Sequence, residues 1–313
     1  MLIISLFVIF LFFKGSKETY ESLSESDARW LAKQEGQLNS WGQASLKLDN
    51  RDNGNLSKIK IAIMDSGIDK KHEDLVGKVI KEYNAINPKE KIEDVYGHGT
   101  AVAGIIAAND NNQGIRGILP NAELYSIKVI SDNGKGNIES LAKGIDWAIK
   151  NKVDLINISF GMPNDKPKLK AAVNKAVKAG IIIVASAGNK YGLNSDYPAS
   201  YNNVISVNAI NSDLKITSFS AKGKINFVAP GTGIVTTILN NNYGVVEGTS
   251  IATAYVTGTI GYILAYKEKF NIPEKGNSNY FNELLKVLED NSLELGDKNI
   301  YGNGLIQLKG VIK

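Results

Sequence analysis

Three short segments of the sequence carry side chains that together could do nucleophilic chemistry. Asp65 ends an apolar run (IAIMD), His98 stands between two glycines (GHGTAVAGIIAA), and Ser250 follows Gly-Thr before a run of small residues. A serine hydroxyl becomes an effective nucleophile when an imidazole takes its proton and a buried carboxylate holds that imidazole. Each segment alone has a plainer interpretation, because turns and helix N-caps use the same residue types.

The composition limits which other chemistries are open. The 313 residues contain no cysteine, which excludes disulfides, thiolate zinc sites, iron–sulfur clusters and a cysteine nucleophile. Only two histidines occur, so an imidazole base must be His72 or His98. His72 lies beside none of the three segments, and we expect it to be a structural or surface residue. The net charge of +4, with no Lys/Arg-rich block, argues against nucleic acid as a partner.

Strand-like and helix-like segments alternate along the chain from about residue 56. β-Branched residues dominate the segments that we expect to be strands, which are 59–64, 122–130, 153–159, 181–186 and 204–210. Apolar residues at helical spacing mark 138–150 as a helix. Pro167 and Gly180 mark the start and the stop of a second helix at 167–179. This alternation predicts an α/β fold of three layers, in which a mostly parallel twisted sheet carries helices on both faces. Active sites gather at the carboxyl ends of such strands.

The order Asp65, His98, Ser250 and the sequences around them resemble the subtilisin-like serine proteases, the subtilases. The resemblance covers nearly the whole chain after residue 37, including a closing YGNGLIQL segment. It implies a monomeric serine endopeptidase that hydrolyses polypeptide substrates through an acyl-enzyme intermediate. Asp65 would orient His98, His98 would act as general base and then acid, and Ser250 would be the nucleophile. Asn189, in ASAGN, would be the side-chain donor to the oxyanion.

Three residues after Ser250 depart from the subtilase pattern. The family usually has Met, Pro and His where this chain has Ile251, Ala254 and Tyr255. Ala254 restores a backbone N–H near the start of the helix, which could shift the nucleophile slightly. The departure motivates a second hypothesis, a catalytically weak protein of the subtilase fold that binds or regulates. The complete triad and the matching asparagine favour the enzyme.

Oxygen-bearing residues at three separated places match the calcium site of the subtilases. The loop 109–115 (NDNNQGI) has the length and placement of the family's calcium loop. The resemblance therefore implies a structural calcium ion, for which oxygen atoms are the suitable ligands. The implied ligands are Gln37, Asp74, Asn109, Asn111, Gln113 and Ile115. Without the resemblance, an ordinary Asn/Gly turn would explain the loop.

The resemblance also implies how a peptide would bind. The substrate would lie as an added strand against residues 134–138 and 159–162. The implied contacts are Ser159, Gly161, Ile138 and Leu141, of which the last two would line an apolar pocket.

Asp196 matches a position at the base of the family's primary specificity pocket. A carboxylate there would favour Arg or Lys before the scissile bond. The alternative is a solvated loop aspartate that the nearby Lys190 already neutralises. The sequence leaves both interpretations open.

The first 36 residues divide into two parts. Residues 1–13 are an apolar segment, shorter than the roughly 20 residues that span a bilayer, which suits a signal peptide or a short membrane anchor. Residues 14–36 are polar and indicate a linker, helical in part through ESDARWLAK, before a catalytic domain at 37–313. We therefore expect a secreted or cell-surface protein that folds without a prodomain. A cytoplasmic protein is the alternative if the apolar segment is not an export signal.

Overall fold

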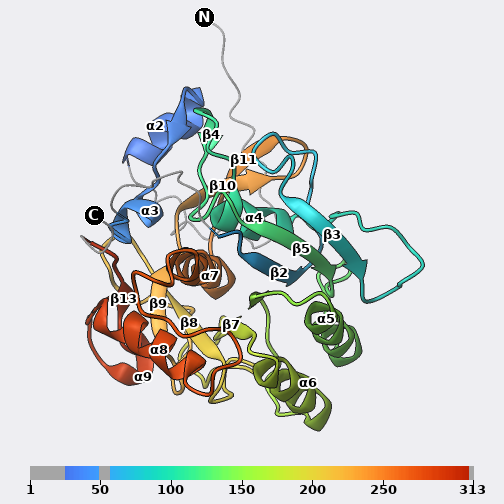
Figure 1. The fold of residues 1–313 in the computed structure, drawn as a ribbon. Coiled ribbons are helices and arrows are strands. Elements are labelled where there is room, and N and C mark those ends of the chain that lie inside the picture. Colours follow the sequence, from blue (N-terminus) through green and yellow to red (C-terminus); the bar gives the residue numbers. More distant parts are fainter. Residues whose placement is uncertain (1–24, 49–56, 310–313) are drawn as a thin grey trace, which may run out of the picture.

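The computed structural model describes residues 25–48 and 57–309, and one large twisted sheet lies at its centre (Figure 1). The strand order is β12-β13-β9-β8-β7-β6-β2-β5-β3, and every pairing is parallel except that of β12 with β13. The strands are β2 (Lys60–Asp65), β3 (Val79–Asn84), β5 (Glu123–Lys128), β6 (Leu155–Ile158), β7 (Ile182–Ser186), β8 (Ile205–Ile210), β9 (Phe227–Pro230), β12 (Ser292–Leu293) and β13 (Leu305–Ile306). The predicted α/β fold with a mostly parallel sheet is confirmed.

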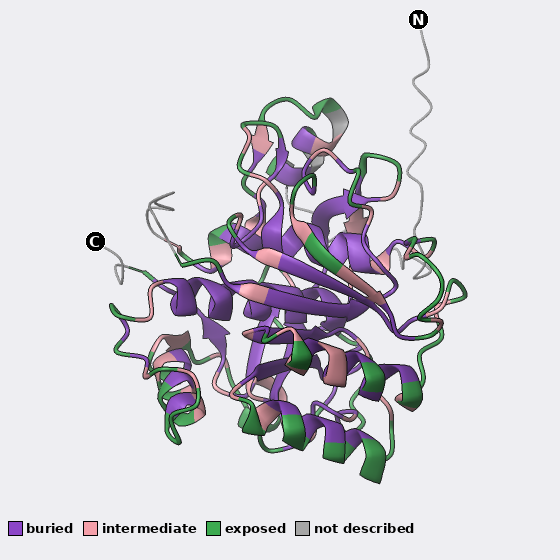
Figure 2. Ribbon diagram, turned by 45° about the vertical axis from the view of Figure 1, so that its right-hand side comes forward, coloured by how far each residue is buried: buried purple, intermediate pink, exposed green. Residues whose placement is uncertain are grey.

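Successive side chains of the central strand face two different helical layers. On β2, Ile61 and Ile63 belong to one hydrophobic cluster, whereas Ala62 and Met64 belong to another. The first cluster includes residues of α4 (His98–Ala107), α7 (Thr249–Ala265) and α8 (Tyr280–Asp290), and the second includes residues of α5 (Ile138–Lys150) and α6 (Pro167–Lys178). In Figure 2 the strands between these layers are mostly buried, while the outer helices bury one side and expose the other.

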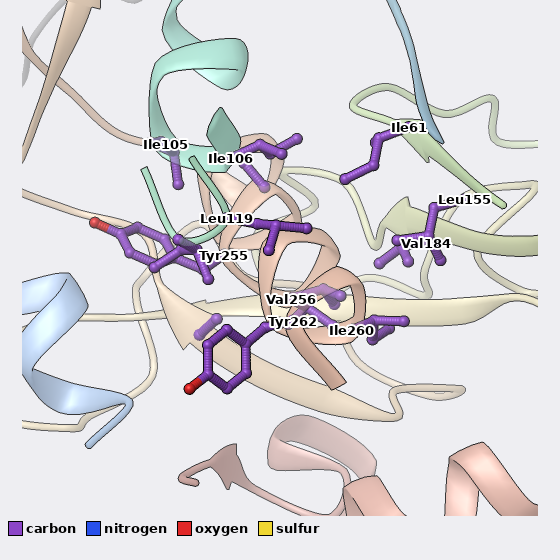
Figure 3. Close-up of a cluster of buried hydrophobic side chains, with 14 of the residues drawn as sticks. Ile61, Ile105, Ile106, Leu119, Leu155, Val184, Tyr255, Val256, Ile260 and Tyr262 are labelled. Atoms are coloured by element: carbon purple, nitrogen blue, oxygen red, sulfur yellow. The ribbon is translucent and has the colours of Figure 1, made fainter. Parts of the chain in front are cut away.

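Helix α7 is buried along its whole length and forms the middle of the first cluster. Small residues let it approach its neighbours closely, since a Cβ at Gly258 would lie 2.6 Å from the Cβ of Ile118. Figure 3 shows Val256 and Ile260 of α7 among buried side chains from the sheet and from α4. This packing fixes the position of the helix N-terminus, where Ser250 lies.

The N-terminal part of the described chain packs on this body. The helix α2 (Glu25–Lys33) confirms the helix expected within the polar segment, and its Trp30 is buried. Asp27 is also buried and accepts a hydrogen bond from the backbone N of Trp41 (3.2 Å), at the start of α3 (Trp41–Ser45). From Glu25 on, the segment that we expected to be a linker is therefore part of the folded structure.

Smaller elements complete the described fold. β1 (Gln37–Leu38) pairs in parallel with β4 (Gly114–Ile115), β10 (Ile234–Ile238) pairs antiparallel with β11 (Asn242–Val246), and α9 (Lys298–Tyr301) follows β12. Within residues 25–48 and 57–309, none of the helices combines the length and the apolar character that a membrane span needs. The apolar segment 1–13 lies outside the described residues.

Candidate active site

The three side chains singled out in the sequence meet at the carboxyl end of the central strand. Asp65 is the last residue of β2, His98 the first of α4, and Ser250 the second of α7. His98 Nδ1 lies 2.8 Å and 2.9 Å from the two carboxylate oxygens of Asp65, and its Nε2 lies 3.0 Å from Ser250 Oγ. With its proton on Nδ1, the imidazole donates to the carboxylate and leaves Nε2 to accept the serine proton.

Burial and nearby charges act in opposite directions on His98. Removal from water disfavours the imidazolium and by itself lowers the pKa of His98. The charge of Asp65, its hydrogen bond and the charge of Asp94 outweigh this effect and hold the pKa of His98 above its ordinary value. The surroundings therefore stabilise a positive charge on this imidazole.

A second carboxylate, which sequence reasoning missed, lies behind the first. Asp94 is buried and accepts four hydrogen bonds, from Ser66 Oγ (2.8 Å), Gly97 N (2.7 Å), Thr100 N (3.0 Å) and Thr100 Oγ1 (2.6 Å). Burial is the larger effect and holds the pKa of Asp94 above its ordinary value, although these donors act to lower it. Ser66 also donates its backbone N–H to Asp65 (2.8 Å). Asp94 thus ties the end of β2 to the beginning of α4.

A buried lysine also connects the segment after β2 with the segment before α4. Lys128, at the end of β5, donates from Nζ to the backbone oxygens of Ser66 (2.6 Å) and Glu93 (2.9 Å). It also pairs with Asp132 (2.8 Å). The polar residue types directly after Asp65 and just before His98 were the available sequence signal for this network.

The side-chain amide of Asn189 lies close to Ser250, and two hydrogen bonds from Thr249 fix its orientation. Its Oδ1 accepts hydrogen bonds from the N and the Oγ1 of Thr249 (3.1 and 2.9 Å), which directs Nδ2 away from Thr249. Gly248, with a φ of +137°, leaves space here, because a Cβ on it would lie 3.1 Å from Ser250 Oγ and 3.6 Å from Asn189 Nδ2. Ser250 Oγ and Asn189 Nδ2 therefore border the same small space beside Gly248.

Asp196 and Gly161, both expected to contact substrate, are neighbours. Met162 pairs with Tyr197 in an isolated antiparallel bridge, and a Cβ at Gly161 would lie 2.5 Å from the Cβ of Asp196. Asp196 is 8% exposed, and its Oδ1 lies 3.1 Å from Lys190 Nζ. The ion pair agrees with the alternative in which Lys190 neutralises Asp196, but Asp196 is buried and not the solvated loop residue of that alternative.

The other three residues expected to contact substrate differ in exposure. Ile138 is half-buried at the start of α5, so part of it faces outward. Ser159 is buried and accepts a hydrogen bond from Asn157 Nδ2 (2.7 Å). Leu141 has 0% exposure within the second core cluster, because one turn further along α5 the side chain faces the sheet. It belongs to the core beneath the expected pocket and not to the pocket surface.

His72 is fully buried, at a position away from the three catalytic segments in the sequence. Its Nε2 lies 2.9 Å from the backbone oxygen of Asn242, and its Nδ1 accepts from the backbone N of Asp74 (3.2 Å). The ring also meets Tyr243 edge-on at 5.1 Å between centroids. These contacts fit a structural residue.

The residues expected to bind calcium come together around Gln37. Its Nε2 lies 3.0 Å from the Asn109 backbone oxygen, 3.2 Å from that of Gln113 and 3.5 Å from Asn111 Oδ1. One polar atom is thus surrounded by three oxygens from the loop 109–115. Such an environment suits a cation, and rotation of the Gln37 amide would present its oxygen instead.

Asp74 supplies the carboxylate of this cluster. It accepts hydrogen bonds from Asn111 Nδ2 (3.1 Å) and from the backbone N of Ile115 (2.8 Å), and a third from Tyr243 (2.8 Å). In the part of the chain that the structure describes, no group of three or more His, Cys, Asp or Glu is placed to hold a metal. A cation at this place would therefore depend mainly on amide and carbonyl oxygens.

The sheet and the hydrogen-bonded carboxylate, imidazole and hydroxyl define a serine hydrolase of the α/β class. Residues 57–304 match the model of the Subtilase family, and the chain belongs to that family. The predicted resemblance is therefore confirmed.

Named relatives agree with this assignment. The chain is 39% identical over 261 residues to the major intracellular serine protease of Bacillus subtilis (strain 168), a match that covers 80% of this chain and 81% of the relative. It is 38% identical over 258 residues to subtilisin DY of Bacillus licheniformis, covering 81% and 90%. It is 40% identical over 253 residues to the minor extracellular protease Epr of Bacillus subtilis (strain 168), covering 80% of this chain and 38% of that longer relative. The chain is a serine endopeptidase, and these relatives give no support to the weak binding protein.

The influence of Asp94 on the pKa of His98 can be measured by NMR, because the chain has only two imidazole rings to assign. We expect Asp94→Asn to lower the pKa of His98, because the variant removes a negative charge that favours the imidazolium. Titration of the imidazole NMR signals gives this pKa, with a His72→Gln variant to assign the two signals. Ser66→Ala is the matched control, because it removes a hydrogen bond to Asp94 but keeps its charge, so the pKa should change less. An equal pKa in wild type and Asp94→Asn would contradict the proposed influence.

Proposed function

We propose that Asp65, His98 and Ser250 are the catalytic triad of this endopeptidase and that Asn189 is its oxyanion donor. Ser250 Oγ attacks the carbonyl carbon of the scissile peptide bond while His98 Nε2 takes the hydroxyl proton. Asp65 holds the Nδ1 proton and balances the charge of the imidazolium. The observation that carries the proposal is the unbroken hydrogen-bond chain, with 2.8 Å from Asp65 to His98 and 3.0 Å from His98 to Ser250.

The remaining steps use the same groups. The negative oxygen of the tetrahedral intermediate accepts hydrogen bonds from Asn189 Nδ2 and from the backbone N of Ser250 at the N-terminus of α7. His98 then returns its proton to the leaving amine, the C–N bond breaks, and the acyl group stays on Ser250. Water attacks the acyl-enzyme with His98 as the base, which releases the acid and restores the hydroxyl.

The unusual residues after Ser250 are compatible with efficient catalysis. Ala254 is fully buried within an uninterrupted α7, and Tyr255 is 2% exposed in the same core. Ser250 keeps its contact with His98 in this setting. The packing around the helix start therefore supports an active nucleophile.

Replacing each histidine in turn separates a catalytic role from a structural one. His98→Ala should lower kcat/KM for a peptide substrate by more than about four orders of magnitude, because the serine loses its base. His72→Ala should retain most of kcat and instead lower the free energy of unfolding by about 1–3 kcal/mol, because buried hydrogen bonds are lost. Labelling of Ser250 with a fluorophosphonate provides an independent readout of nucleophile activation. Full activity in His98→Ala with loss in His72→Ala would reverse the assignment.

We also propose that the cluster around Gln37 binds a structural calcium ion. The implied ligands are Gln37, Asp74, Asn109, Asn111, Gln113 and Ile115, all of which lie in one cluster. When bound, the ion supplies positive charge that holds the loop 109–115 against the segment at Gln37. Trp30 of α2 packs edge-on against Tyr243 (5.2 Å between centroids), which donates to Asp74, so the N-terminal helix rests on the same cluster.

Calcium removal tests this site. A chelator should lower the Tm of the full chain by about 5–10 °C, as expected for a ligand present at about 100 times its Kd. Asn111→Ala should abolish most of the difference between calcium and chelator, and Asn202→Ala, at an exposed position, should preserve it. Equal thermal stability with calcium and with chelator, with no calcium measured in the protein, would remove the proposal.

We propose further that residues 1–13 direct the chain out of the cell, as a signal or as a short membrane anchor, and that the catalytic domain at 37–313 acts there as a monomer. The support is the apolar run itself. The relatives include one protease named as extracellular and one named as intracellular. A cytoplasmic location is the alternative if the segment does not serve in export.

A further inference from the structure

Two buried hydroxyl groups form a chain of hydrogen bonds that ends on the proposed oxyanion donor. Ser186 is the last residue of β7, and its Oγ lies 2.7 Å from Oγ1 of Thr249, the first residue of α7. Thr249 Oγ1 in turn lies 2.9 Å from Asn189 Oδ1. Ser186 and Thr249 are 2% and 1% exposed, whereas Asn189 is exposed. The exposed amide is therefore tied to a buried strand end and a buried helix start.

The direction of these bonds follows from the protons that each group carries. The backbone N of Thr249 donates to Asn189 Oδ1 (3.1 Å), so the oxygen of this amide and not its NH₂ group faces Thr249. The one hydroxyl proton of Thr249 then points to Asn189, because two oxygens 2.9 Å apart would otherwise face each other without a proton between them. Thr249 Oγ1 has no second proton. Ser186 is therefore the donor in the bond between the two hydroxyls.

Ser186 is also fixed from its other side. Its Oγ accepts a hydrogen bond from the backbone N of Gly188 (3.2 Å), the residue directly before Asn189. A serine that accepts from the backbone two residues further on holds that part of the chain in a turn. One hydroxyl thus restrains both the backbone that carries Asn189 and, through Thr249, its side chain.

This restraint bears directly on the oxyanion. An exposed asparagine side chain can adopt several rotamers, and only those with Nδ2 near Ser250 Oγ can stabilise the developing charge. With Oδ1 held by Thr249, Nδ2 stays beside Gly248, where a Cβ would lie 3.6 Å from Nδ2 and 3.1 Å from Ser250 Oγ. Hydrogen bonds that run in one direction polarise one another, so the proton from Ser186 strengthens the bond from Thr249 to Asn189.

We propose that Ser186 is a positioning residue of this endopeptidase, which orients the oxyanion donor Asn189 through the hydroxyl of Thr249. The inference rests on the proposed function, because it requires Asn189 to stabilise the oxyanion. The carbonyl oxygen gains its negative charge only as Ser250 attacks, so an oriented donor favours the transition state more than the bound substrate. Loss of the Ser186 hydroxyl therefore affects kcat and not KM.

The first test compares kcat and KM of the full chain and of Ser186→Ala on one peptide substrate. We expect kcat to fall by about threefold to tenfold, as for the loss of one hydrogen bond, and KM to stay within about twofold. Ser206→Ala is the matched control. Ser206 is 0% exposed on the neighbouring strand β8, but its Oγ donates to the backbone oxygen of Lys224 (2.9 Å), so this variant should keep kcat within about twofold.

A double-mutant cycle separates positioning from a general effect on the fold. Asn189→Ala removes the donor and should lower kcat by about two orders of magnitude. In that background Ser186→Ala has no donor left to orient, so it should change kcat by less than about twofold. Thr249→Val removes the intermediate hydroxyl at similar size, and Ser186→Ala should add equally little to it. Ser186→Cys, whose thiol is a weak donor, serves in the same comparisons if Ser186→Ala does not fold.

The outcomes distinguish the role of Ser186 from that of Asn189. An unchanged kcat in Ser186→Ala, a change in KM alone, or an equal loss of kcat in the wild-type and Asn189→Ala backgrounds overturns the inference. If Asn189→Ala still lowers kcat in that case, the oxyanion proposal stands and only the role of Ser186 falls. If Asn189→Ala keeps the wild-type kcat, the oxyanion proposal fails and the inference fails with it.

Discussion

A buried carboxylate at the end of β2 is the constraint on which the site depends. Asp65 is 1% exposed, and a charge removed from water is costly unless it is paired and hydrogen-bonded. The Ser66 backbone N–H and the His98 imidazole provide these partners. The arrangement in turn favours positive charge on His98, which is the state that arises when a serine hydroxyl gives up its proton.

The scaffold holds these groups by close packing of elements that are far apart in the sequence. At the start of α4, a Cβ on Gly99 would lie 2.0 Å from the backbone oxygen of Gly67, so only a glycine allows the helix to approach the strand end. On the other side, α7 is buried throughout and cannot shift without disturbing the main core. The nucleophile and the base are therefore positioned by two helices that share one hydrophobic cluster.

Much of the fold and the three principal residues could be predicted because their signals are local. β-Branched runs marked the strands β2, β5, β6, β7 and β8, and residue types and order marked Asp65, His98 and Ser250. The edge strand β3 was missed because polar residues interrupt its pattern, and part of it is exposed. Asp94 was missed because its partners depend on how a loop folds back, and Leu141 was misplaced because the rotation of α5 against the sheet decides which residues face inward.

Replacing Asp65 with Asn tests most directly whether the buried charge drives catalysis. The change keeps the size of the side chain but removes the charge and can favour the wrong imidazole tautomer. The measurement is kcat/KM for peptide hydrolysis by the variant, in protein shown to be folded by its thermal transition. We expect a decrease of about four orders of magnitude relative to wild type. A folded variant with kcat/KM within about tenfold of wild type would contradict the central role of Asp65.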